Sequence, residues 1–245
     1  LNLEGKDQVR GWWNSQIILS EIRFEKKPFE SILVHGMILD LGKKKMSKSL
    51  GNIISPNDII NKYNRDYLRY YFAKLSKGED FAFNEEEFKE IKKVFTMLSN
   101  VNNFIDQISK GKYKISVEDK WILSKYSLLV KEVTEKYNSY LFSEAVQKIE
   151  EFLIQDLSRN YIKLIRDRSE ETYEILNEIR IGLIKLLAPI IPFTTESIWQ
   201  ELRDKKIVRE ESIHLSQFPR VDKKKINVEL ESQMDFVLQI IEYGL

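Results

Sequence analysis

The residues best suited to chemistry lie in one glycine-bounded loop. Four lysines and two serines fall between Gly42 and Gly51. Lysine ammonium groups neutralise phosphate charge, serine hydroxyls add hydrogen bonds, and glycines let the backbone come close to a ligand. The loop is not a Walker loop, because the G-x-x-x-x-G-K spacing is absent. The pattern favours a polyphosphate site, and a solvated lysine loop is the alternative that charge alone would favour.

The elements around this loop have the order of an α/β fold. Leu1 lies in what looks like a strand, Gln8–Ile22 has the periodicity of a helix, and Ser31–Asp40 has the β-branched content of a buried strand or a tight strand pair. Glycines at the junctions complete a strand, helix, strand order. Two shorter helices are then predicted, at Ser55–Tyr63 and Asp66–Ser76.

From about residue 85 the sequence predicts an antiparallel helical bundle with short loops. Glycines become rare there, and apolar residues recur three and four positions apart. The expected helices are Glu85–Ile108, Asp119–Tyr137, Ser143–Asp167, Glu171–Leu187 and a short helix capped by Thr194 or Thr195 that runs through Leu202. The predicted division is therefore an α/β region over residues 1–84 and a helical region over residues 85–245.

Composition excludes several classes of protein. The chain has 39 basic and 38 acidic residues, and this balance argues against a polybasic binder. It has no cysteine, which excludes disulfides, cysteine zinc sites and iron–sulfur clusters, and its two histidines, His35 and His214, are isolated. The longest uncharged stretch, Leu186–Thr195, contains two prolines and is too short for a membrane span, which needs roughly 20 apolar residues. We expect no bound metal and no membrane segment.

Several longer strings in the chain match the pattern of one family. Lys45-Met-Ser-Lys-Ser49 is a KMSKS signature, and Leu3–Trp13 matches an EGxDQxRGWF stretch. Further matching strings are Asp119–Ser124, Asp156–Arg168, Ala188–Trp199 and Ile213–Pro219. With these strings, residues 1 to about 220 resemble the isoleucyl-tRNA synthetases, a member family of the class I aminoacyl-tRNA synthetases. The Asp156–Arg168 string resembles the archaeal and eukaryotic branch more closely.

The resemblance implies a reaction and a set of site residues. The family activates isoleucine with MgATP to isoleucyl-adenylate, releases pyrophosphate and transfers the acyl group to tRNA(Ile) in the cytoplasm. By this resemblance, Lys48 would contact the ATP phosphates and stabilise charge on the pyrophosphate leaving group, and Lys45 would assist it or position the loop. Met46, Ser47 and Ser49 complete the implied ATP-binding loop. The residues implied to hold the aminoacyl-adenylate are Glu4, Gly5, Asp7 and Gln8.

Some of these residues also have structural interpretations. Asp7 could instead cap the Gln8–Ile22 helix, because Asp is a common N-cap. Trp12 and Trp13 are more often core residues than ligand contacts. His35, at the end of an apolar strand, could serve as a backbone-bonding residue as well as a catalytic one.

The helical region resembles the family's anticodon-binding domain. Arg159, Lys163 and Arg166 recur at i, i+4 and i+7 and predict a basic face that could bind tRNA phosphates. An ordinary solvated helix presents the same face. The opposite stripe is expected to carry Leu157, Tyr161, Leu164 and Ile165.

The chain also departs from the family pattern. The His-Ile-Gly-His-type signature, the inserted editing domain and the usual zinc-binding parts are not found, and the sequence starts without Met inside a predicted strand. We expect the C-terminal half of a catalytic domain followed by an anticodon-binding domain, inactive until the missing N-terminal half is supplied. The alternative is a freestanding tRNA-binding accessory protein derived from such an enzyme.

Overall fold

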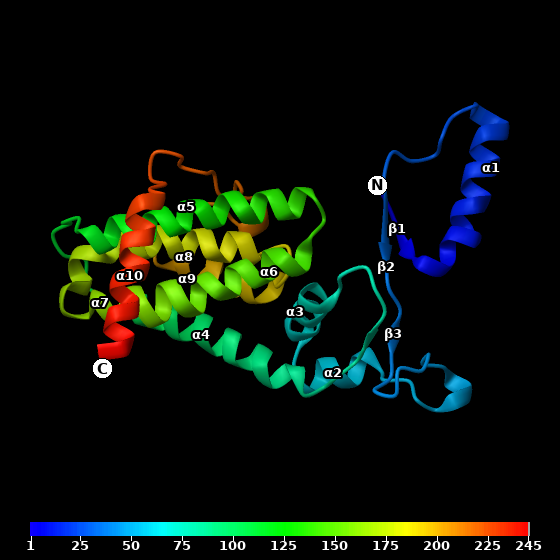
Figure 1. The fold of residues 1–245 in the computed structure, drawn as a ribbon, viewed down its shortest axis with the longest axis horizontal. Helices are drawn as coiled ribbons and strands as arrows, with labels where there is room; N and C mark the ends of the chain where they lie inside the picture. The colour runs from blue at the N-terminus through cyan, green and yellow to red at the C-terminus, as the bar shows by residue number, and fades with distance from the viewer. Residues whose placement is uncertain (245) are drawn as a thin grey trace.

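The computed structural model describes residues 1–244 and shows two regions arranged along the longest axis of the molecule (Figure 1). A region of short strands with one projecting helix lies at one end, and a bundle of helices forms the rest. The structure therefore confirms the predicted fold class, a partial α/β fold followed by an antiparallel helical bundle.

The strands are short and the helices carry most of the fold. The strands are β1 (Asn2–Gly5), β2 (Ile32–His35), β3 (Ile38–Leu39) and β4 (Phe81–Ala82). The helices are α1 (Trp12–Phe24), α2 (Pro56–Lys62), α3 (Arg65–Leu75), α4 (Glu87–Gln107), α5 (Val117–Asn138), α6 (Phe142–Glu151), α7 (Ile162–Leu164), α8 (Tyr173–Leu187), α9 (Pro192–Asp204) and α10 (Val228–Gly244).

The predicted strand over Ser31–Asp40 is two strands in two different sheets. β2 pairs with β1 and β3 pairs with β4, both in parallel, so β2 and β3 do not pair with each other as a tight strand pair would. The buried Gly36 separates them, and a Cβ at this position would lie 1.9 Å from the carbonyl oxygen of Glu79. The expectation of burial is also wrong, because the strand residues are half-buried or exposed.

The first helix begins later than the sequence predicts. Lys6–Arg10 forms a 3₁₀ turn, and α1 starts at Trp12 after a break at Gly11. The side-chain oxygen of Gln8 accepts the backbone N–H of Trp12 at 3.1 Å. The alternative in which Asp7 caps a helix starting at Gln8 is therefore wrong, because the α-helix starts at Trp12 and the Asp7 carboxylate accepts a hydrogen bond from the Gln8 side chain.

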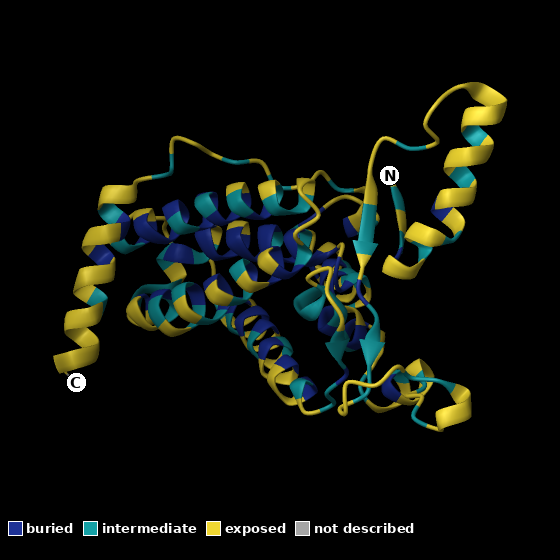
Figure 2. Ribbon diagram, turned by 45° about the vertical axis from the view of Figure 1, so that its right-hand side comes forward, coloured by how far each residue is buried: buried dark blue, intermediate teal, exposed yellow. Residues whose placement is uncertain are grey.

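The apolar core crosses the predicted boundary near residue 84. The buried apolar side chains from Ile59 to Met234 form one cluster, which appears as dark blue along the inside of the bundle in Figure 2. Tyr71 of α3 stacks on Phe88 of α4 with ring centroids 4.9 Å apart, and Phe83 packs between the two regions. α2 and α3 are thus fixed to the bundle, and they hold β4 and its partner β3 beside it.

The periodicity of apolar residues predicted α2, α3, α4, α5 and α8 to within two residues at each end. The long helix expected at Ser143–Asp167 is instead α6, a π-helical segment over Phe152–Tyr161, α7 and a 3₁₀ turn from Arg166. In a π-helix each N–H bonds the carbonyl five residues back, so the side chains turn more slowly around the axis than an α-helix allows.

Helix α9 is capped from another helix, and not by Thr194 or Thr195 as expected. It begins at Pro192, and the buried carboxylate of Asp66 on α3 accepts the backbone N–H groups of Phe193 at 3.4 Å and Thr194 at 2.5 Å. A carboxylate at a helix N-terminus is favourable because it satisfies free N–H groups and faces the positive end of the helix dipole.

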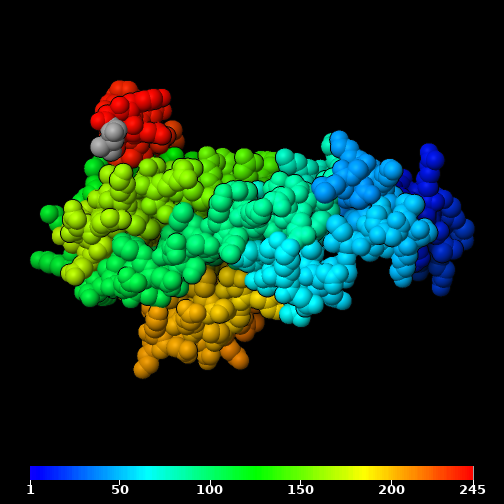
Figure 3. Space-filling model, turned by 90° about the horizontal axis from the view of Figure 1, so that it is seen from below, coloured from blue at the N-terminus to red at the C-terminus, as the bar shows by residue number. Residues whose placement is uncertain are grey.

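The last helix, α10, was not predicted from the sequence. It packs on α5, where the Ser124 hydroxyl donates to the buried carboxylate of Glu231 and accepts the N–H of Asn227 at 2.7 Å. The ammonium of Lys125 lies 3.5 Å from Asp235 of α10 and 3.6 Å from Asp156. Figure 3 shows α10 in red on one side of the bundle, and the residues around 200 in orange on the other.

Candidate active site and nucleic-acid interface

The four residues implied to hold an adenylate gather at the carboxyl end of β1. Glu4 and Gly5 end the strand, and Asp7 and Gln8 lie in the following 3₁₀ turn. Asp7 folds over Gly5, where a Cβ would lie 2.6 Å from its Oδ1. The other carboxylate oxygen of Asp7 accepts the side-chain N–H of Gln8 at 2.9 Å. Ligands of open α/β sheets bind at this end of the strands.

A residue that the sequence did not single out, Asp80, ties this corner to the next strand. Its carboxylate pairs with the ammonium of Lys6 and accepts the N–H of Met37 at 2.7 Å. The hydrogen bond from Lys6, followed by that from Met37, lowers the pKa of Asp80. The turn after β1 is thereby held against the link between β2 and β3. No local signal could have revealed this, because Lys6 and Asp80 are 74 positions apart.

The KMSKS loop is folded into a compact shape after β3. The backbone of Lys45 forms an isolated antiparallel β-bridge with Leu39, and Lys48–Leu50 forms a 3₁₀ turn. The hydroxyl of Ser47 accepts the N–H of Leu50 at 3.3 Å and lies 3.1 Å from the hydroxyl of Ser49. The turn ends at Gly51, whose φ of 64° is in the left-handed region that favours glycine.

The lysines of this loop are exposed and free of acidic partners. Lys43, Lys44, Lys45 and Lys48 are all exposed, and none forms an ion pair within residues 1–244. The nearest loop carboxylate, Asp40, is bound by neutral donors, and the backbone hydrogen bond from Lys44 lowers its pKa. Four unpaired ammonium groups on one short loop are suited to a polyphosphate ligand.

Trp12, Trp13 and His35 each had a structural and a functional interpretation, and the structure places them differently. Trp13 is buried, which agrees with a core residue, whereas Trp12 is 52% exposed. His35 is exposed, with its Nδ1 2.9 Å from the carbonyl oxygen of Gly36, so it contacts the backbone. His35 lines a cleft of about 810 Å³ between the strands and the bundle, together with Arg69, whose guanidinium donates to two backbone carbonyls.

The basic residues predicted for RNA binding are exposed, but they do not lie on one regular helix. Arg159 belongs to the π-helical segment, Lys163 to α7, and Arg166 begins the 3₁₀ turn. None of the three forms an ion pair within the described part of the chain, and Arg159 donates only to Gln155, at 3.2 Å. Leu164, expected in the apolar stripe, is 40% exposed, because the helix changes type before it.

Arg168, which ends the same string, has a structural role. Its guanidinium donates to the fully buried Asp119 at 2.8 and 3.0 Å and to Glu118 at 3.0 Å. The hydroxyl of Tyr161 also donates to Asp119, at 2.7 Å. Burial alone would lower the pKa of Arg168, but its hydrogen bonds to Asp119 and Glu118 outweigh this and raise it. Arg168 is therefore committed to the bundle and unavailable to a ligand.

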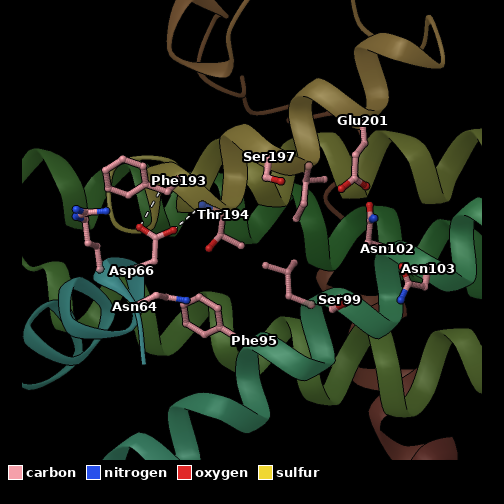
Figure 4. Close-up of a pocket in the computed structure, with 13 residues that line it drawn as sticks. Asn64, Asp66, Phe95, Ser99, Asn102, Asn103, Phe193, Thr194, Ser197 and Glu201 are labelled. Atoms are coloured by element: carbon pink, nitrogen blue, oxygen red, sulfur yellow. Dashed lines mark hydrogen bonds between the residues drawn. The ribbon is translucent and has the colours of Figure 1, made fainter. Parts of the chain in front are cut away.

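A second groove, of about 470 Å³, lies between α4 and α9 near the start of α3. Figure 4 shows Asp66 hydrogen-bonded to the start of α9, Asn102 and Asn103 on α4, and Ser197 and Glu201 on α9. None of the site residues predicted from the sequence lines this groove.

The described residues contain no clear metal site or membrane span. Among residues 1–244, no group of three or more His, Asp or Glu side chains is placed to hold a metal ion. None of the helices in that range is long and apolar enough to cross a membrane.

Comparison with protein families assigns both regions. The model of the class I tRNA synthetases (I, L, M and V) matches residues 1–84, and that of the anticodon-binding domain of tRNA ligase matches residues 119–243. The chain belongs to the class I tRNA synthetases. Within this family, curated relatives named isoleucine–tRNA ligase match over almost the whole chain. Those of Methanosarcina barkeri and Methanosarcina acetivorans are 37% and 38% identical to it. Each alignment is 263 positions long, gaps included, and covers 98% of this chain.

Both the relatives and the solved structures are longer than this synthetase chain. The alignments cover 25% of each Methanosarcina relative, so the chain spans about a quarter of their length. A ternary complex of a LeuRS with tRNA and LeuAMS from Agrobacterium radiobacter matches 92% of this chain and 29% of its own, with a TM-score of 0.71 and 18% identity. The structure of methionyl-tRNA synthetase of Mycobacterium tuberculosis, bound by methionyl-adenylate, matches 82% of this chain and 44% of its own length. Its TM-score is 0.65 and its sequence identity is 19%. These likenesses show the class I fold.

Proposed function

We propose that this chain is the KMSKS-containing part of the catalytic domain and the anticodon-binding domain of an isoleucine–tRNA ligase. The observation that carries the proposal is the loop at Lys45–Ser49, which follows a strand of the α/β region and whose exposed lysines have no acidic partner within residues 1–244. The choice of isoleucine is supported by the relatives named isoleucine–tRNA ligase.

In this proposal the loop acts on ATP by charge alone. Isoleucine and MgATP react to isoleucyl-adenylate and pyrophosphate, and the acyl group then passes to tRNA(Ile). Lys48 stabilises the charge that develops on the pyrophosphate as it leaves, and Lys45 assists it, with Met46, Ser47 and Ser49 forming the rest of the loop. The adenylate is held at the end of β1 by Glu4, Gly5, Asp7 and Gln8.

The rest of a class I catalytic domain is the partner that we propose for α1 and β1. The outer side of α1 is strongly apolar, with Ile22 76% exposed and Leu19 63% exposed. In the described residues β1 pairs with β2 only, so its other edge has free N–H and C=O groups. An exposed apolar surface beside an open sheet edge is typical of an interface. The chain spans about a quarter of the relatives' length, and the N-terminal half of a class I catalytic domain is the partner that we propose for this surface.

We assign tRNA binding to the helical region. Arg159, Lys163 and Arg166 are exposed cations without ion-pair partners in residues 1–244. Such side chains can approach backbone phosphates and displace counterions, and the resulting affinity falls as the salt concentration rises.

Isoleucine-dependent exchange of pyrophosphate into ATP tests the catalytic part of the proposal. The complete synthetase that contains this chain is expected to exchange with isoleucine and far less with valine or methionine. The 245-residue chain alone is expected to show no exchange, because positioning ATP and isoleucine together needs the other half of the site. Exchange by the chain alone would contradict this division of the site.

Filter binding of tRNA(Ile), with the valine and methionine tRNAs as controls, tests the helical part across a salt titration. Preferential binding of tRNA(Ile) that weakens with salt is expected. If the chain binds tRNA but never supports exchange, even with the N-terminal half of the catalytic domain supplied, the accessory tRNA-binding alternative replaces the enzyme.

A further inference from the structure

Two side chains at the base of the KMSKS loop close it into a ring. Asn52, which follows the loop, accepts the N–H of Ser47 at 2.9 Å with its Oδ1. Its Nδ2 donates to Asp40 at 2.7 Å and to the carbonyl of Lys45 at 3.3 Å. Asp40, which precedes the loop, accepts the N–H of Lys44 at 2.8 Å with its other oxygen. Asn52 is thus hydrogen-bonded to Lys45 and Ser47 within the loop and to Asp40, which precedes it.

This arrangement leaves the loop lysines without an ion pair to Asp40 within residues 1–244. An aspartate among four lysines would normally pair with one of their ammonium groups. Both oxygens of Asp40 are instead occupied by neutral N–H donors, one from the backbone of Lys44 and one from Asn52. The carboxylate orders the backbone, and the ammonium groups remain free for a ligand.

The bonds also order the segment that carries the proposed catalytic lysines. Lys45 is held through its own carbonyl, and Lys48 begins the turn that Ser47 caps. The N–H of Ser47 is held by Asn52, so the start of that turn depends on the same amide. A loop fixed before the ligand binds loses less conformational freedom when it acts.

We propose that Asp40 and Asn52 are positioning residues that fix the KMSKS loop and present Lys45 and Lys48 to the polyphosphate. The inference rests on the proposed function. Neither residue touches the substrate in this proposal, and both act through the loop.

An exchange of the two side chains tests the proposal in the complete synthetase. Asn52→Asp removes both donated hydrogen bonds and places a second carboxylate against Asp40. The double variant Asp40→Asn with Asn52→Asp restores the bond between the two side chains with donor and acceptor reversed. It can also keep the bonds to the N–H groups of Lys44 and Ser47, and it loses only the longer bond to the carbonyl of Lys45. Asn57→Asp is the matched control, because Asn57 is exposed and its side chain makes no hydrogen bond within residues 1–244.

The expected result is a loss of turnover that the exchanged pair recovers. For Asn52→Asp, kcat of isoleucine-dependent ATP–pyrophosphate exchange should fall at least about tenfold while KM for isoleucine changes less than about twofold. The double variant should return to within about threefold of the unsubstituted enzyme, and Asn57→Asp should match it. A loss of folded enzyme would lower the apparent kcat with the same unchanged KM, so the urea midpoint of Asn52→Asp must match that of Asn57→Asp for the loss to be assigned to loop positioning.

Tryptic cleavage after Lys43–Lys48 gives a second measurement that needs no activity. It should be at least about tenfold faster in Asn52→Asp and should slow again in the double variant, since proteolysis reports loop opening. Unchanged cleavage together with unchanged kcat would overturn the inference, as would a failure of the double variant to recover. Absence of exchange in the unsubstituted enzyme would overturn the proposed function, and the cleavage rates would still decide whether the pair fixes the loop.

Discussion

Replacing Arg168 with methionine should destabilise the helical region without touching the predicted RNA contacts. Arg168 is the only cation bonded to Asp119 within residues 1–244, and the Asp119 side chain is fully buried. In Arg168→Met the carboxylate keeps the hydroxyl of Tyr161 and the N–H of Ser116 as donors, but it loses its counter-charge. Methionine fills much of the volume of the arginine, so the perturbation is mainly electrostatic.

The size of the effect follows from the burial of this pair. Removing one partner of a buried ion pair costs about 3–5 kcal/mol, because the other charge remains desolvated. The Arg168 side chain is 21% exposed, so water can partly solvate the gap, and we expect about 3 kcal/mol. That is a large share of the ~5–15 kcal/mol by which a typical domain is stable.

Urea unfolding followed by circular dichroism measures this difference. Arg166→Met is the matched control, since Arg166 is exposed and forms no ion pair in the described residues, and it should stay within about 0.5 kcal/mol of the native chain. Adding Asp119→Asn to Arg168→Met removes the orphaned charge and should recover much of the loss. A change below about 1 kcal/mol for Arg168→Met would refute the interpretation of Arg168 as a structural clamp.

Three further results are expected. In the complete enzyme, Lys48→Ala should slow isoleucine-dependent ATP–pyrophosphate exchange by on the order of 100-fold or more and leave tRNA binding intact. A loss of exchange rate below about tenfold would contradict this. Arg159→Glu and Lys163→Glu should each weaken tRNA binding while changing the free energy of unfolding by less than about 0.5 kcal/mol, and binding that does not respond to salt would count against the phosphate contacts. Burial raises the pKa of Asp156 to about 6 despite its neighbour Lys125, so the folded chain binds an extra proton between about pH 4 and 6 and loses stability as the pH rises through 6. Urea unfolding at pH 5 and 7.5 should therefore show Asp156→Asn gaining stability relative to the native chain at the higher pH, and the opposite trend would disprove the assignment.

Much of the candidate site was predictable because it is local in sequence. The KMSKS loop and the Glu4–Gln8 segment are contiguous strings, and the bundle helices have apolar residues at a helical period. What could not be predicted depends on side chains from distant positions. Asp80 reaches Lys6, and Asp66 replaces the local cap of α9. Neither pairing has a signature in the sequence, because many acidic side chains are equally plausible partners before the chain is folded.

The type of helix was a second feature that the sequence did not predict. The spacing of Arg159, Lys163 and Arg166 predicts one face only if the backbone is an α-helix throughout, and the π-helical segment and the following 3₁₀ turn break that assumption. The same change brings Leu164 to the surface although it was expected in the apolar stripe. The exposure of the three cations was predictable from their charge, but their mutual geometry was not.

The two basic regions of this chain show why residue type alone does not identify a ligand-binding cation. Arg168 and Arg159 belong to one string, yet Arg168 faces a carboxylate that has no access to water and Arg159 faces only a neutral amide. In the KMSKS loop the acid is near the lysines in sequence, but neutral N–H donors occupy both of its oxygens. A cation is free to bind phosphate when nearby acids are absent or otherwise engaged, and a cation that neutralises a buried acid is retained by the fold. By this criterion Lys45, Lys48 and Arg159 are available to a phosphate ligand, and Arg168 is not.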